Sequence, residues 1–139
     1  MDFTEKNIII SGGSSGIGFA LARQLVNKGA NLTLLARRKD LLKESVGLLE
    51  QEKVYPTQRL DYIAADVSDF HQLKQAIEKY KQSFDILINS AGVAYPGLFL
   101  DMDSEIFKNV IEINYLGTVN LTKLIVPGMI IQKSGHIVN

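Results

Sequence analysis

The sequence has 139 residues, no cysteine, and 15 lysines and arginines balanced by 15 aspartates and glutamates. This length fits one domain with a single core, and the balanced charge disfavours nucleic acid or an anionic membrane surface as a partner. Without cysteine there is no disulfide and no thiolate ligand, so we expect no metal site. The longest nearly apolar stretch, Leu121 to Ile131, is too short for a membrane span and contains Lys123, Pro127 and Gly128. We therefore expect a cytoplasmic protein.

Short apolar runs and amphipathic segments alternate along the chain. The apolar runs predict strands at Asn7–Ile10, Leu32–Ala36, Leu60–Ala65, Asp85–Asn89 and Gly135–Asn139. The segments between them predict helices starting near Ile17, Asp40, Phe70 and Asp103, with Asp40 as N-cap of the second helix and Ser68 or Asp69 as N-cap of the third. This order predicts an α/β protein, one domain over residues 1–139 with a doubly wound parallel sheet (Rossmann fold) that stops at the start of strand five.

The stretch from Ser11 to Gly18 lies between the first strand and the first helix, and it is typical of a phosphate-binding turn. Backbone N–H groups and the positive end of the helix dipole meet at such a point and favour a diphosphate. Gly12 is expected to allow the tight turn, Gly16 to let the diphosphate approach the backbone, and Gly18 to let the helix pack closely. The alternative is a serine-glycine loop without a ligand.

A P-loop is the rival interpretation of the same glycines. Gly13 and Gly18 have its four-residue spacing, but Phe19 and Ala20 occupy the places of its lysine and its serine or threonine. The sequence therefore excludes a P-loop.

Further polar residues follow the other predicted strands, and ligands of doubly wound sheets bind beyond the carboxyl ends of the strands. Arg37 ends strand two, where an NAD site would normally place an acidic residue on the ribose hydroxyls. A guanidinium there can hold a 2′-phosphate, which favours NADP over NAD. The alternative is that Arg37, Arg38 and Lys39 form a solvated turn.

Asp66, Asn89 and Asn114 each have two interpretations from sequence. Asp66 could accept a hydrogen bond from an adenine amino group or act as a helix N-cap. The Asn89 amide is expected to tie neighbouring loops together, while small residues at Ala91 and Gly92 leave space for a ring. Asn114 falls on the predicted buried stripe of the long helix, where it could support a catalytic lysine through water or tie the helix to a strand.

Together these motifs resemble the short-chain dehydrogenase/reductase family. The matching elements are Ser11-Gly12-x-x-x-Gly16-x-Gly18, Asp66-Val67, Asn89-x-Ala91-Gly92 and Asn114. Within that family the chain is most similar to the 3-ketodihydrosphingosine reductases, through Leu35-Ala36-Arg37, Ala91-Gly92-x-Ala94 and Gly97-x-Phe99.

The resemblance implies an NADPH-dependent reduction of a ketone to an alcohol, with a 3-keto sphingoid base as the candidate substrate. It implies cofactor-binding roles for Gly12, Ser14, Ser15, Gly16, Ile17, Gly18, Arg37, Asp66, Val67, Asn89, Ala91 and Gly92. It implies a catalytic position at Asn114, and a homo-oligomer of the full-length form built partly on the long helix.

The family's catalytic serine and Tyr-x-x-x-Lys pair do not occur within residues 1–139, since none of the five tyrosines has a lysine four positions on. The tyrosine would deliver a proton, its pKa lowered by the lysine. We therefore expect these 139 residues to be inactive alone and to expose apolar surface that favours self-association. The alternative function is a non-catalytic NADP-binding fragment or pseudoenzyme.

Overall fold

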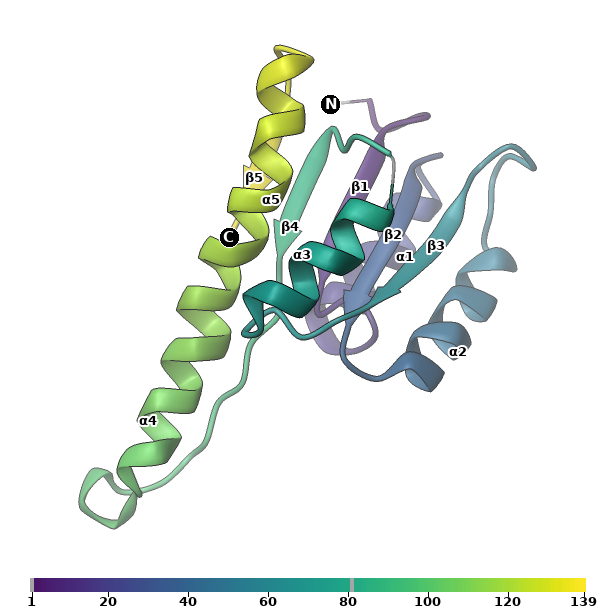
Figure 1. Cartoon of the computed structure of the whole chain (residues 1–139). Coiled ribbons are helices and arrows are strands. Elements are labelled where there is room, and N and C mark those ends of the chain that lie inside the picture. The colour runs from purple at the N-terminus through teal and green to yellow at the C-terminus, as the bar shows by residue number, and fades with distance from the viewer. Residues whose placement is uncertain (1, 81) are drawn as a thin grey trace.

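The computed structural model describes residues 2–80 and 82–139 and contains one five-stranded parallel sheet (Figure 1). Its strands are β1 Asn7–Ser11, β2 Asn31–Ala36, β3 Leu60–Ala64, β4 Ile86–Asn89 and β5 His136–Val138. They lie in the order β3-β2-β1-β4-β5, all pairs parallel. The predicted doubly wound α/β fold is confirmed, and each strand lies within one residue of its expected bounds.

Helices cover both faces of this sheet. They are α1 Gly16–Val26, α2 Lys39–Glu50, α3 Phe70–Lys79, the 3-10 turn η1 Phe99–Asp101, and a long continuous helix made of α4 Ser104–Val110, the π-helical η2 Ile111–Leu116 and α5 Gly117–Ile131. Helices α1 and α2 lie on one face and α3 and α5 on the other, and the α4 end of the long helix extends past the sheet in Figure 1.

The central strand β1 explains why two helical layers are needed. Ile8, Ile9 and Ile10 are all fully buried. Since side chains alternate along a strand, Ile8 and Ile10 join the core with Leu42 of α2, whereas Ile9 joins the opposite core with Leu73 of α3. Each such burial contributes about 1.5–3 kcal/mol. The continuous apolar run of β1 is thus typical of a parallel strand buried on both faces.

The structure tests the predicted N-caps of α2 and α3. The predicted N-cap role of Asp40 is wrong, because Arg38 takes the extended N-cap conformation and Asp40 lies inside the first turn of α2. There its carboxylate still meets the positive end of the helix dipole. Asp69 is the N-cap of α3, since its Oδ1 accepts the backbone N–H of Gln72 at 2.9 Å.

The long helix begins as expected but is not uniform. Asp103 caps it by accepting the Glu105 N–H at 3.1 Å. The helix contains the π-helical turn η2, where Ile113 is buried, as is Gly117 just after it, while Asn114 is exposed. The expectation that Asn114 lies on the buried stripe is therefore wrong.

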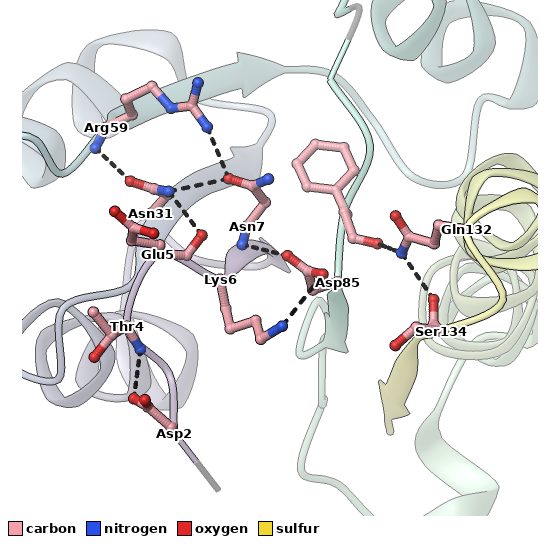
Figure 2. Close-up of polar contacts among 11 residues, drawn as sticks. Asp2, Thr4, Glu5, Lys6, Asn7, Asn31, Arg59, Asp85, Gln132 and Ser134 are labelled. Carbon is pink, nitrogen blue, oxygen red and sulfur yellow. Dashed lines mark hydrogen bonds and ion pairs between the residues drawn. The ribbon is translucent and has the colours of Figure 1, made fainter.

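A polar network joins the amino ends of four strands (Figure 2). The Asn7 side-chain oxygen accepts from Asn31 Nδ2 and from Arg59 Nη2, both at 3.1 Å. The Asn7 backbone N–H donates to Asp85 Oδ2 at 2.9 Å, and the Lys6 ammonium lies 3.8 Å from Asp85 Oδ1. These side chains bind one another, which ties this edge of the sheet together.

Several apolar side chains along the outer side of the long helix and the loop before it are exposed. They include Leu98, Phe99, Leu100, Ile111, Tyr115, Ile130 and Ile131. Within residues 2–80 and 82–139, no helix is both long enough and apolar enough to cross a membrane.

Candidate functional site

The glycine turn after β1 has the geometry that the sequence predicts. Gly12 has a φ of +67°, and a Cβ there would lie 2.7 Å from the Ser90 carbonyl oxygen. A Cβ at Gly18 would lie 2.5 Å from the Gly12 carbonyl oxygen, so the first turn of α1 can approach the loop only as glycine. Gly16 has a φ of +55° and open space where a Cβ would be. The expected roles of Gly12 in the tight turn and of Gly18 in close packing are confirmed.

Ser11, the last residue of β1, joins this turn to the loop after β4. Its buried hydroxyl oxygen accepts the backbone N–H groups of Ser90 and Ala91, each at 3.1 Å. Ser11 belongs to the predicted glycine motif, but the sequence alone assigns it no role. The available signal was its position as the first polar residue after the buried run Ile8, Ile9 and Ile10.

The amino end of α1 has unused hydrogen-bond donors. Ser15 is its N-cap residue but makes no side-chain capping bond, and the first turn contains no acidic residue. Its first backbone N–H groups therefore have no side-chain acceptor at the point where the helix dipole is positive. Ile17 is 77% exposed, so this end of the helix is open to a ligand.

A groove of about 240 Å³ runs along the carboxyl ends of β1, β2 and β3. Eight of the predicted residues line it, namely Gly12, Ser14, Ser15, Arg37, Asp66, Val67, Ala91 and Gly92. It is completed by Leu35, Ala36, Arg38, Ala65, Val93 and Ile113, which were not predicted as site residues. Gly16, Ile17, Gly18, Asn89 and Asn114 do not line it.

Two charged residues that line this groove, each following a neighbouring strand, form an ion pair. Arg37 Nη1 lies 3.7 Å from Asp66 Oδ2, with the Arg37 side chain 61% exposed and that of Asp66 28% exposed. The other oxygen, Asp66 Oδ1, accepts from the Ser68 backbone N–H at 2.9 Å and from the Ser68 hydroxyl at 2.7 Å. Since Asp69 caps α3, the interpretation of Asp66 as a helix N-cap is wrong.

Val67, which lines the groove, contacts the long helix. A Cβ at Gly117 would lie 2.6 Å from Val67 Cγ2, so helix and strand end approach closely only with glycine there. Asn120 Nδ2 also donates to the Val67 carbonyl oxygen at 2.9 Å. The wall of the groove at Val67 is therefore held by two contacts with α5.

The two predicted asparagines both tie segments together. Asn89 Nδ2 donates to Thr122 Oγ1 at 3.3 Å and to Asn139 Oδ1 at 2.8 Å, as the expected role in joining neighbouring segments requires. Its Oδ1 is buried and accepts no hydrogen bond from the described residues. Asn114 Oδ1 accepts the Val93 N–H, and Asn114 Nδ2 donates to the Val93 carbonyl. Asn114 thus ties the helix to the loop after β4.

A larger recess, of about 510 Å³, lies at the opposite edge of the sheet. Its buried amide, Gln58, already donates to the carbonyls of Val26 and Ala30 and accepts from the backbone of Val54 and Tyr55. The Gln58 amide is therefore already fully used by the chain itself. The groove at the carboxyl edge, with open glycine backbone and an exposed guanidinium, is the better candidate.

A parallel sheet with this strand order and a glycine turn opening the first helix defines the class of doubly wound α/β proteins that bind dinucleotides at the strand ends. The short chain dehydrogenase family profile matches residues 6–139. The chain belongs to this family.

Its relatives and structural neighbours are oxidoreductases. Oxidoreductase UcpA of Salmonella typhimurium is 38% identical over 138 residues, covering 97% of this chain and 51% of that protein. The 3-ketodihydrosphingosine reductase of Bos taurus is 32% identical over 136 residues, covering 95% of this chain and 41% of that protein. The chain thus spans about half the length, or less, of the curated relatives it matches.

Two solved structures carry different cofactors. A 3-oxoacyl-[acyl-carrier protein] reductase from Brucella melitensis with bound NAD has a TM-score of 0.89 at 28% identity, covering 99% of this chain and 53% of that one. The L-sorbose reductase of Gluconobacter frateurii, complexed with NADPH and L-sorbose, has a TM-score of 0.86 at 29% identity with the same coverage of 99% and 53%.

Proposed function

We propose that this chain is the NADPH-binding part of a reductase that converts a ketone to an alcohol. The observation that carries the proposal is the position of Arg37, whose exposed guanidinium lines the same groove as the glycine turn. A guanidinium suits a 2′-phosphate, and an uncapped helix start suits a diphosphate. The groove therefore offers complementary charge for both anionic groups of NADPH.

The chain's own residues divide the binding work between them. The free N–H groups at the start of α1, with the open backbone at Gly16, would hold the diphosphate. Ser14 and Arg37 would hold the 2′-phosphate, while Asp66 and Val67 would line the adenine site. When bound, NADPH supplies a hydride for the carbonyl carbon of the substrate.

Asn114 and Asn89 serve this site indirectly. Asn114 holds the Val93 backbone and so positions the loop whose Ala91 and Gly92 line the groove. Asn89 holds the end of β4 against α5, and we propose that it lies beside the ribose. Asn114 is accordingly a positioning residue in this proposal.

A 3-keto sphingoid base is the substrate we propose, because relatives include enzymes named 3-ketodihydrosphingosine reductase. Since the chain spans 41% of the bovine relative, the 139 residues would supply the cofactor-binding part of such an enzyme. The competing function is nucleotide binding without catalysis.

Cofactor choice is tested by titrating the purified protein with NADPH and NADH, following the fluorescence of the reduced nicotinamide. We expect tighter binding of NADPH, and Arg37→Ala should weaken NADPH binding about tenfold or more while changing NADH little. Lys39→Ala, which removes an exposed charge just beyond the groove, is the matched control. Equal affinity for both cofactors in the unmodified protein would refute the proposal.

Activity is tested by adding 3-ketodihydrosphingosine and measuring NADPH consumption and alcohol formation. The reductase proposal for the whole protein requires ketone-dependent consumption when the protein carries the family's serine and Tyr-x-x-x-Lys. For residues 1–139 alone we expect binding without consumption. Binding without consumption by the whole protein would favour the non-catalytic alternative.

A further inference from the structure

We propose that Asp66 is a specificity-determining residue that lowers the preference for NADPH over NADH by competing for Arg37. The inference rests on the proposed function, in which Arg37 receives the 2′-phosphate. It concerns the Asp66 oxygen that faces Arg37. This role is separate from the proposed contact of Asp66 with adenine.

The ion pair lies where the competition requires it. Arg37 Nη1 is 3.7 Å from Asp66 Oδ2, and both residues line the groove. Within the described residues, Asp66 is the only carboxylate that lies within 4.0 Å of Arg37. The free protein thus already offers this guanidinium an anion.

Of the two side chains in this ion pair, the Asp66 carboxylate is held more firmly than the Arg37 guanidinium. Its Oδ1 accepts from both the backbone N–H and the hydroxyl of Ser68, at 2.9 and 2.7 Å. These two bonds hold the carboxylate so that Oδ2 faces Arg37. The Arg37 side chain is 61% exposed, so it is the group that must move when a phosphate arrives.

Two anions then compete for one cation. A 2′-phosphate must draw Arg37 away from Asp66 or share the guanidinium with that carboxylate. NADH has no phosphate at this position and leaves the ion pair intact. Asp66 therefore weakens NADPH binding selectively. An exposed pair of this kind changes the affinity about two- to fivefold.

The test measures NADPH and NADH dissociation constants for Asp66→Asn. Asparagine keeps an oxygen that can accept from Ser68 or from adenine, but it removes the charge that faces Arg37. We expect NADPH to bind about two- to fivefold more tightly and NADH to change less than that. The gain should shrink with added salt, because exposed charges are screened. Asp61→Asn, an exposed carboxylate of β3 outside the groove, is the matched control.

A double variant separates this mechanism from a general charge effect. In an Arg37→Ala background, Asp66→Asn should no longer change the ratio of NADPH to NADH affinity. If the ratio still rises there, a long-range field acts and competition for Arg37 is wrong. Equal weakening of both cofactors by Asp66→Asn would also overturn the proposal, because it would show a purely structural or adenine-binding role.

If Asp66→Asn does not fold, Asp66→Ser removes the same charge with a shorter side chain. The ratio of NADPH to NADH affinity is then measured for this variant. A different result would refute the proposed function itself. In that case Arg37→Ala alone would leave the preference for NADPH over NADH unchanged. If Arg37→Ala loses the preference for NADPH as expected, but neither Asp66 variant binds NADPH more tightly, only the proposed competition between Asp66 and the 2′-phosphate is overturned.

Discussion

The Asn114 side chain makes two hydrogen bonds to the backbone of Val93, as a neighbouring strand would do. The Val93 N–H donates to Asn114 Oδ1 at 2.8 Å, and Asn114 Nδ2 donates to the Val93 carbonyl at 2.9 Å. The long helix therefore holds the backbone of the loop that lines the groove. This relationship joins the π-helical turn to the groove at the carboxyl ends of the strands.

Asn114→Ala removes both bonds. We expect a loss of about 1–2 kcal/mol in the free energy of unfolding, since each net hydrogen bond contributes about 0.5–1.5 kcal/mol. Binding of NADPH and NADH should weaken together, because the loop carries no cofactor preference. Urea unfolding and cofactor titration measure the two effects. Asn109→Ala loses only one bond, to the Tyr95 hydroxyl, and should cost less. Equal costs would contradict a special role for the Val93 pair.

Glycine substitutions should differ in sign according to their surroundings. Gly18→Ala forces a Cβ to within 2.5 Å of the Gly12 carbonyl oxygen, so we expect destabilisation by about 1–3 kcal/mol and loss of cofactor binding. Gly47→Ala, inside α2 with open space around its Cβ, should stabilise the protein by about 0.5–1 kcal/mol. Thermal unfolding of both variants is the measurement. A neutral Gly18→Ala would show that the turn can relax.

Local patterns predict most of the fold. The buried run of β1, the glycines after it and the alternation of segments specify the strands, because each signal involves neighbours in sequence. The groove was predicted for the same reason, since parallel strands bring their carboxyl ends to one edge. Arg37 and Asp66 were each identified from their place at a strand end.

The contacts between these residues could not be predicted in the same way. Ser11 binds the backbone of Ser90, 79 positions away, and this pairing depends on the order of strands in the finished sheet. The spacing of Asn114 from Val110 and Gly117 predicts a buried position, whereas Asn114 is exposed and binds the backbone of Val93, 21 positions away, a contact that depends on where the loop after β4 lies. Asp40 failed as an N-cap because neighbouring residues compete for the helix start, and Arg38 takes the cap position.

Ser11→Ala should destabilise the junction between β1 and the loop after β4. Ser11 is only 2% exposed, and removing its hydroxyl leaves the N–H groups of Ser90 and Ala91 without their acceptor. We expect a loss of about 1–3 kcal/mol. Ser15→Ala, which removes an exposed hydroxyl that makes no capping bond, should change stability by less than about 0.5 kcal/mol. Urea unfolding distinguishes them, and similar losses would refute the role of Ser11.

Tyr80 should make stability depend on pH in the alkaline range. Burial raises the pKa of Tyr80 above its ordinary value of 10.0, although its hydrogen bond with Thr33, at 2.9 Å, acts in the opposite direction. Because the folded state holds this proton more tightly than the unfolded state does, the contribution is fully present below the unfolded pKa. It is lost as the pH rises above about 10.

Tyr80→Phe removes the titrating hydroxyl. At neutral pH we expect a loss of about 1 kcal/mol, because the buried Thr33 hydroxyl loses its partner. Between about pH 9 and pH 11 the variant should lose less stability than the unmodified protein, since one group with a raised pKa is gone. Urea unfolding across this range is the measurement, with Tyr115→Phe, an exposed tyrosine, as control. A parallel decline in the unmodified protein and Tyr80→Phe would contradict the raised pKa, because the slope must differ wherever the two states bind different numbers of protons.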